Sequence, residues 1–172
     1  MKKMHYVLAT MVIIMAIGQV KLNAAPVDTS AVRMEVTNNL AKLHNAMKNM
    51  DKSAVSSLLA KDVLFLGTDP GEIMDKSGAL GMMDNGTVTY SDSDKSDKMD
   101  YSVNTRKVMV SEDGKSAITV EQFMVPQFSK EMPVRLITHM IQTPEGWKFD
   151  FVSWNFIPPN GDLKTIDEAL ED

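Results

Sequence analysis

The apolar residues of this chain follow a helical period in one early segment and mostly an alternating, strand-like period after it. Over residues 30–50 they recur at steps of three and four residues: Val32, Val36, Leu40, Leu43, Met47 and Met50. This spacing predicts one helix with a continuous apolar side, capped by Asp28 or Ser30. A second, shorter helix is expected to begin at Asp51 or Ser53. The apolar side needs a covering surface, which the later strands can supply.

Strands dominate the rest of the prediction. We expect them at residues 63–66, 88–91, 101–110, 117–125, 134–142 and 147–157, with short helices over 77–83 and near 163–170. This order predicts an α+β domain. Its N-terminal helices pack on a strongly curved mixed or antiparallel sheet, which forms a cone with a pocket inside.

The first 24 residues have the layout of a secretory signal peptide. Lys2 and Lys3 precede an uncharged apolar run over 7–18, and small residues end the segment at Ala24. The run is shorter than the ~20 residues that cross a bilayer, so a retained anchor is the less favoured alternative. We expect cleavage after Ala24, export to the periplasm or the cell exterior, and one domain over residues 25–172.

The composition of residues 25–172 excludes several classes of function. Fifteen basic side chains stand against 23 acidic ones, a formal charge of −8, which disfavours nucleic acid and anionic membranes as partners. The absence of cysteine excludes thiol chemistry. The acidic loop 92–100 lacks the glycine and glutamate of a calcium-binding loop, so we expect no metal, and no motif suggests a cofactor.

The turn over residues 143–146 predicts the register of the last two strands. It pairs Gln142 with Trp147, and in turn Met140 with Phe149, Thr138 with Phe151 and Arg135 with Trp154. On this register the concave face is apolar with a polar end, carried by Thr138, Phe151, Ser153 and Asn155. The opposite face carries His139 beside Asp150 and is apolar enough to suggest a covering second subunit.

Two groups of titratable residues are candidates for chemistry. His139 and Asp150 can form an acid–base pair, although a structural pair on the convex face is the favoured interpretation. Asp69 and Glu72 follow a sharp turn at Gly67 and can act on a substrate, or simply cap the turn, which we favour.

The segment Phe65-Leu66-Gly67-Thr68-Asp69-Pro70-Gly71-Glu72 resembles the SnoaL-like branch of the nuclear transport factor 2-like superfamily. The segments Thr138-His139 and Gly146-Trp147-Lys148-Phe149 resemble the same group. The resemblance implies a cone-shaped α+β domain, commonly a homodimer, in a family of isomerases, cyclases, dehydratases and non-enzymatic binding or assembly domains. Met74 and Ser153 stand where tryptophan and histidine are frequent in that family, so the resemblance implies the fold rather than one reaction.

We therefore expect an exported homodimer that binds a small, largely apolar molecule, rather than an enzyme. Phe65 and Tyr90 are expected in the pocket wall, and Asp69 and Glu72 at its rim. Two alternatives stay open. One is an isomerase, cyclase or dehydratase with an acid or His139 as general base, and the other is an assembly module whose cone is filled by its own side chains.

Overall fold

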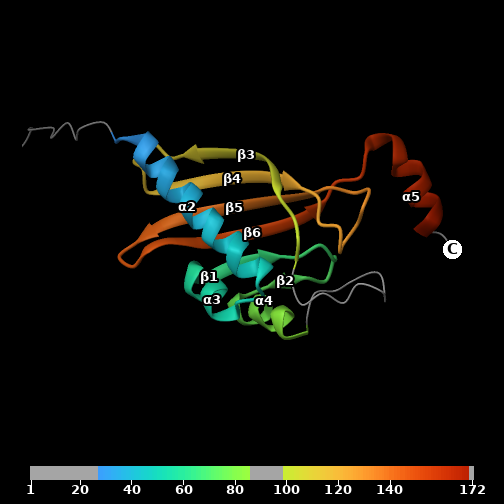
Figure 1. Ribbon diagram of the computed structural model, residues 1–172, viewed down its shortest axis with the longest axis horizontal. Helices are drawn as coiled ribbons and strands as arrows, with labels where there is room; N and C mark the ends of the chain where they lie inside the picture. The colour runs from blue at the N-terminus through green and yellow to red at the C-terminus, as the bar shows by residue number, and fades with distance from the viewer. Residues whose placement is uncertain (1–26, 86–98, 171–172) are drawn as a thin grey trace, which may run out of the picture.

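The computed structural model describes residues 27–85 and 99–170, which form a sheet with helices on one side of it (Figure 1). The predicted signal peptide, the predicted strand 88–91 and Tyr90 lie outside the described residues. The described helices are α2 (Thr29–Lys48), α3 (Lys52–Leu58), α4 (Lys76–Met82) and α5 (Leu163–Leu170), with 3-10 turns η1 (Met83–Asn85) and η2 (Asn160–Asp162). No helix in this part of the chain is long and apolar enough to span a membrane.

The sheet has six strands in the order β2-β1-β6-β5-β4-β3. Their bounds are β1 Leu59–Leu66, β2 Ile73–Met74, β3 Val103–Val110, β4 Ser116–Phe123, β5 Val134–Thr143 and β6 Gly146–Phe156. Strands β1 and β6 run parallel, and every other neighbouring pair is antiparallel. The predicted α+β class with a mixed sheet is confirmed, although β2 was missed because it is only two residues long.

Helix α2 crosses one face of the sheet (Figure 1). The Asp28 carboxylate caps it by accepting from the backbone N–H of Ser30 at 3.0 Å, which supplies a partner for a donor that the helix leaves free. Its apolar side is buried as predicted, with Val36 and Leu40 at 0% exposure. These residues pack on the alternate side chains of β4, β5 and β6, so this helix-covered face is the core side of the sheet.

The predicted register of β5 and β6 is correct near the turn and wrong beyond it. Gln142 pairs with Trp147 and Met140 with Phe149, but His139 then pairs with Phe151 instead of Asp150. Asp150 is thus an extra residue, a β-bulge. Because side chains alternate between faces, one extra residue exchanges the two faces for the rest of β6.

This exchange changes which β6 residues face the core. Thr138 pairs with Val152 and Arg135 with Asn155, so the predicted partners Phe151 and Trp154 were each displaced by one position. Val152 and Trp154 lie on the helix-covered face. Phe151, Ser153 and Asn155 lie on the opposite face, which corrects their predicted place in the pocket.

The last helix extends past the end of the sheet (Figure 1). Helix α5 has no buried residue, and its Leu163 and Leu170 are 50% and 81% exposed. The short helix predicted here is confirmed, but it does not pack back on the sheet.

Candidate functional site

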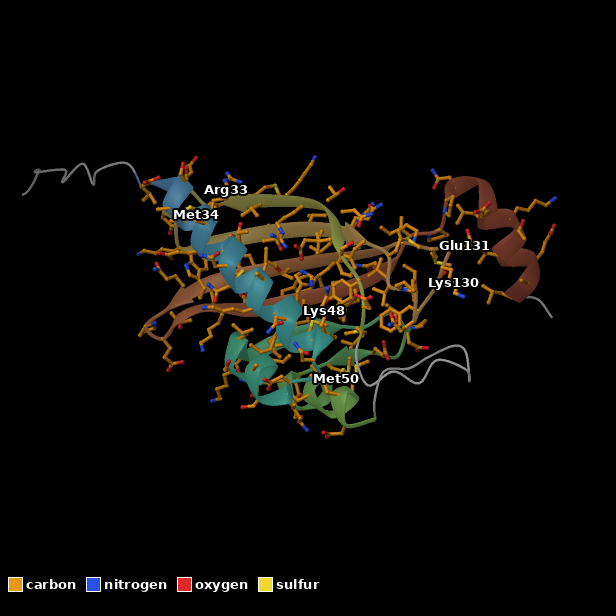
Figure 2. All side chains as sticks on the ribbon, in the orientation of Figure 1. Arg33, Met34, Lys48, Met50, Lys130 and Glu131 are labelled. Atoms are coloured by element: carbon orange, nitrogen blue, oxygen red, sulfur yellow. The ribbon has the colours of Figure 1, made fainter. Side chains whose placement is uncertain are left out.

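A cavity of about 440 Å³ opens beside the C-terminal half of α2. Its walls come from α2, α3, α4, β1 and β6, and Figure 2 shows Met50 where α2 ends. Most of the lining is apolar. It includes five methionines and three aromatic residues: Met47, Met50, Met82, Met83, Met99, Phe65, Phe128 and Trp154. Flexible thioether side chains let such a wall adapt to the shape of a ligand.

The polar part of the lining comes from the turn after β1. Gly67, Thr68, Asp69 and Glu72 all border the cavity, and Asp69 is exposed while Glu72 is half-buried. The backbone N–H of Asp69 donates to Glu72 Oε2 at 3.0 Å, and that of Gly71 donates to Asp69 Oδ1 at 3.0 Å. The predicted capping role is therefore present. Each of the two carboxylates uses one of its oxygens to accept from a backbone N–H of the turn.

Trp154 forms part of the wall on the sheet side. Its side chain is 5% exposed, and its indole Nε1 is buried without a hydrogen-bond partner. Trp147 provides the contrast, because its Nε1 donates to Glu35 Oε2 at 2.9 Å. A buried N–H without a partner costs about 1–3 kcal/mol, so Trp154 is a local weak point of the packing next to the cavity.

The structure brings together some of the predicted site residues and separates others. Phe65, Asp69 and Glu72 border the cavity. Thr138 is fully buried under α2, where its hydroxyl lies 2.7 Å from that of Thr119. The bulge at Asp150 places three predicted site residues on the other face of the sheet: Phe151, Ser153 and Asn155. There, Asn155 Nδ2 donates to Ser153 Oγ at 3.1 Å.

The predicted pairing of His139 with Asp150 is present, on the face away from α2. His139 Nδ1 lies 2.7 Å from Asp150 Oδ1, and the two side chains are 33% and 29% exposed. Asp150 also borders a second, more polar hollow of about 660 Å³ between α3, the start of β1 and the β5–β6 hairpin. The pair is therefore separated by the sheet from the apolar cavity, as the structural interpretation expected.

A polar cluster that the sequence analysis missed lies between α2 and the sheet. We call His44, Tyr101, Arg106 and Glu121 the His44 cluster. Three of these side chains are buried, and that of Arg106 is 29% exposed. His44 Nε2 lies 2.6 Å from Glu121 Oε2, and Arg106 Nε donates to Glu121 Oε1 at 2.5 Å. His44 Nδ1 lies 2.9 Å from the Tyr101 hydroxyl, which donates to it when the ring is neutral. His44 itself is buried, at 6% exposure.

The charges in the His44 cluster support one another. Burial alone favours the protonated form of Glu121, but the hydrogen bonds and charges of His44 and Arg106 outweigh it and lower the pKa of Glu121. Burial, together with the charge of Glu121, raises the pKa of Tyr101, so this phenol stays protonated. The ammonium group of Lys48, labelled in Figure 2, lies 4.6 Å from the centre of the Tyr101 ring. None of the four cluster residues lines the cavity.

The cluster had one weak signal in the sequence. Glu121 alternates with Thr119 and Phe123 on the buried side of β4, so it is an acid in a row of inward positions. Its partners come from α2, from β3 and from the segment before β3. No spacing rule connects these segments.

The described residues contain no group of three or more His, Cys, Asp or Glu side chains arranged to hold a metal ion.

Comparison with known proteins identifies the fold. A family model described as SnoaL-like domain matches residues 36–152. A nuclear transport factor 2-like protein from Cytophaga hutchinsonii is 16% identical, with a TM-score of 0.59 over 73% of this chain and 98% of its own. A cystatin-like fold protein from Burkholderia xenovorans is 13% identical, with a TM-score of 0.60 over 75% and 94%.

A putative Ca/calmodulin-dependent kinase II association domain from Exiguobacterium sibiricum is 18% identical, with a TM-score of 0.53 over 80% of this chain and 100% of its own. At these identities the likeness shows the fold alone. No curated protein matched the chain.

Proposed function

This chain belongs to the SnoaL-like domain family, within the nuclear transport factor 2-like superfamily, and we propose that it is an exported protein that binds a small, largely apolar molecule. One observation carries the proposal. The cavity of about 440 Å³ is walled mainly by methionine, aromatic and aliphatic side chains, and its acidic groups come from a single turn. Its size lies in the usual range of about 300–1,000 Å³ for small-molecule sites.

The position of the titratable groups favours binding over catalysis. A general base for an isomerase or dehydratase has to reach a bound substrate inside the cavity. Asp69 and Glu72 border the cavity, but each uses an oxygen to cap its own turn. His139, the other candidate base, is on the far face of the sheet with Asp150. An assembly module with a filled cone fits poorly with an open cavity of this size.

The experiment is native mass spectrometry of the protein purified from its own host, followed by extraction and identification of any bound molecule. We expect a co-purified apolar ligand at close to one per chain. The variant Met82→Trp, which places a larger side chain in the cavity, should release it, whereas Met34→Trp, at an exposed position of α2 outside the cavity lining, should not. A fully folded protein that carries no ligand and takes up none from an apolar library would contradict the proposal.

We also propose that the sheet face away from α2 joins two copies of this chain. It exposes three large apolar side chains, Leu64, Met109 and Ile118, to 44%, 53% and 43%. Three strands supply them. The register aligns them in one row across the sheet, Leu64 opposite Phe151 and Met109 opposite Ile118, with His139 between the two pairs. Exposed apolar side chains on one sheet face are typical of an interface. Sedimentation equilibrium should give a dimer, and Ile118→Asp should give a monomer that keeps the cavity's ligand.

Export is the last part of the proposed function. We expect the mature chain to begin at Ala25, outside the cytoplasm. The intact mass of the protein recovered from the periplasmic and extracellular fractions checks this. A mass that includes residues 1–24 would contradict cleavage.

A further inference from the structure

Helix α5 has an apolar side that the rest of the described chain does not cover. Leu163, Ile166 and Leu170 recur at steps of three and four residues, so they share one side of the helix. Leu163 is 50% exposed and Leu170 is 81% exposed, and no residue of α5 is buried. In water, an isolated helix shorter than about 12–15 residues is marginal, and α5 has eight. This helix therefore depends on a surface that covers its apolar side.

The segment before α5 directs the helix away from its own sheet. The backbone N–H of Ile157 donates to the carbonyl oxygen of Pro133 at 2.9 Å, which fixes the point where the chain leaves β6. Pro158 and Pro159 follow, and Pro159 has the extended backbone of a stiff segment (φ −56°, ψ 139°). Figure 1 shows α5 beyond the end of the sheet. A covering surface therefore has to come from another molecule.

Acidic side chains flank the apolar side of α5. Asp167 is three and four residues from two members of that side, and Asp162 directly precedes the helix. Lys164 Nζ lies 3.5 Å from Glu168 Oε1. Neither Asp162 nor Asp167 forms an ion pair within residues 27–85 and 99–170. The helix thus presents an apolar side bordered by unpaired negative charge.

The sheet face away from α2 has the complementary character. Lys107 on β3 is two residues from Met109, and Arg135 on β5 is four residues from His139, so all four point to this face. The positions of β3, β4 and β5 on this face hold these two cations and no acid. Neither cation has an ion-pair partner in the described part of the chain. Asp150, from β6, is already paired with His139.

From these two surfaces we propose that α5 packs on the sheet face away from α2 of a second copy of this chain, while α5 of that copy packs on this one. Leu163, Ile166 and Leu170 contact the apolar row that contains Met109 and Ile118. The acids beside them lie near the two unpaired cations. The inference rests on the proposed dimer and deepens it by naming the segment that joins the two copies.

Two-fold symmetry makes this contact reciprocal. Each copy provides its helix and receives the helix of the other, so every favourable contact forms twice in one dimer. An acidic amphipathic peptide of another protein would gain only one such contact. The apolar contacts supply most of the affinity, and the opposite charges determine how the helix is placed.

Introduced cysteines test the contact directly, because the chain has none of its own. Leu170→Cys is combined in turn with a cysteine at Leu64, Met109 or Ile118, and each double variant is mildly oxidised and separated on a non-reducing gel. The matched control combines Leu170→Cys with Met34→Cys, since Met34 is 67% exposed on α2. A disulfide needs Cα atoms within about 7 Å, so at least one pair should give about five times more covalent dimer than the control.

The same gel identifies the other possible positions of α5. A disulfide closed within one chain would mean that the helix covers its own sheet. A yield of covalent dimer no higher than that of the control, for all three pairs, would mean that the helix does not reach this face. Either result overturns the inference.

Charge reversal tests the complementarity. Asp162→Lys/Asp167→Lys should weaken the dimer about tenfold, and so should Lys107→Glu/Arg135→Glu, because each places like charges in contact. The chain with all four substitutions restores opposite charges and should return to within about threefold of the wild type by sedimentation equilibrium. Lys42→Glu, at an exposed position of α2, is the control and should change nothing. If the fourfold variant dimerises no better than the two double variants, the proposed placement of α5 is wrong.

Leu170→Asp separates this inference from the proposed dimer. It removes one apolar contact in each copy and should weaken the dimer at least about tenfold. If the wild type is a monomer at every concentration, the proposed dimer itself fails. If the wild type is a dimer and Leu170→Asp dimerises equally well, this inference fails while the dimer stands.

Discussion

Helix α2 meets the sheet in two regions that are built in opposite ways. At the His44 cluster, polar side chains of the helix, of β3 and β4 and of the segment before β3 are paired, with contacts of 2.5–2.9 Å. Three of these side chains are buried, and that of Arg106 is 29% exposed. At the cavity, starting from the neighbouring Leu43, the wall is mainly apolar and encloses open space. The first region is closely paired, and the second leaves room for a ligand.

This difference separates the structural role of the helix from its binding role. Buried paired charges tolerate only one arrangement, because a shift of the helix would leave a charge unpaired in a dry environment. A wall of methionines tolerates many arrangements at little cost. We therefore expect substitutions in the His44 cluster to affect folding, and substitutions around the cavity to affect binding.

The largest expected effect is that of Glu121→Ala. It leaves His44 and Arg106 without their shared partner and should lower the free energy of unfolding by about 3–5 kcal/mol. Urea denaturation followed by circular dichroism measures it. The control Glu131→Ala, at an exposed loop position, should stay within about 0.5 kcal/mol of the wild type. A loss below about 1 kcal/mol for Glu121→Ala would remove the cluster's assigned role.

Next comes a pair of truncations, one in each region. Leu40, on the buried side of α2, is at 0% exposure, so Leu40→Ala should cost about 3 kcal/mol. Met83 borders the cavity and already lacks neighbours on one side, so Met83→Ala should cost only about 1 kcal/mol. The same urea titration compares them. If Met83→Ala proves the more damaging of the two, the cavity wall is as well packed as the core.

Acid should weaken the His44 cluster without disturbing the apolar wall. The pKa of Glu121 is lower in the folded protein than its ordinary value of 4.5. Its charge therefore stabilises the fold fully above about pH 4.5, and this contribution is lost as the pH falls through the lower, folded-state pKa. Unfolding free energies measured from pH 6 down to about pH 3 should fall more steeply for the wild type than for Glu121→Gln.

The wild type and Glu121→Gln share all other acidic groups, so the difference between their pH curves reports on Glu121 alone. Backbone and side-chain hydrogen bonds also lower the pKa of Asp75 and of Asp113, and both remain in the variant. Parallel pH curves for the two proteins would mean that Glu121 contributes no charge-dependent stability.

The smallest expected effect on stability is at the rim. A Cβ added at Gly67 would lie 1.9 Å from Glu72 Oε2, so Gly67→Ala must displace this carboxylate. The loss of its bond to the Asp69 N–H should cost about 1 kcal/mol, which urea denaturation measures. Gly81→Ala, in α4 with no atom within 4 Å of the added Cβ, should be neutral or slightly stabilising. A Gly67→Ala protein as stable as Gly81→Ala would show that the Glu72 cap contributes nothing to the stability of the turn.

Local patterns predicted the elements well, because each depends on neighbours in the sequence. The three- and four-residue spacing identified the buried side of α2, and Asp28 and Asp51 cap the helices as expected. The turn that carries Asp69 and Glu72 was also predicted, since glycine, proline and acidic residues determine a turn locally. These same residues at the end of β1 supplied the correctly predicted part of the cavity lining.

The faces of β6 depended on the folded chain as a whole. One extra residue at Asp150 exchanges the faces of β6, so Trp154 instead of Ser153 borders the cavity. Alternation continues unchanged in the sequence across such a bulge, which is why counting residues from the turn went wrong.

The sequence by itself determined the helix that covers the sheet, the α+β class, the family and the acidic turn, because periodicity and turn chemistry act over a few residues. Tertiary structure alone decided that His44 meets Glu121, 77 positions along the chain, and that an indole N–H is left unpaired beside a cavity. Both depend on strand register and helix docking, which are set by the packing of segments distant in sequence.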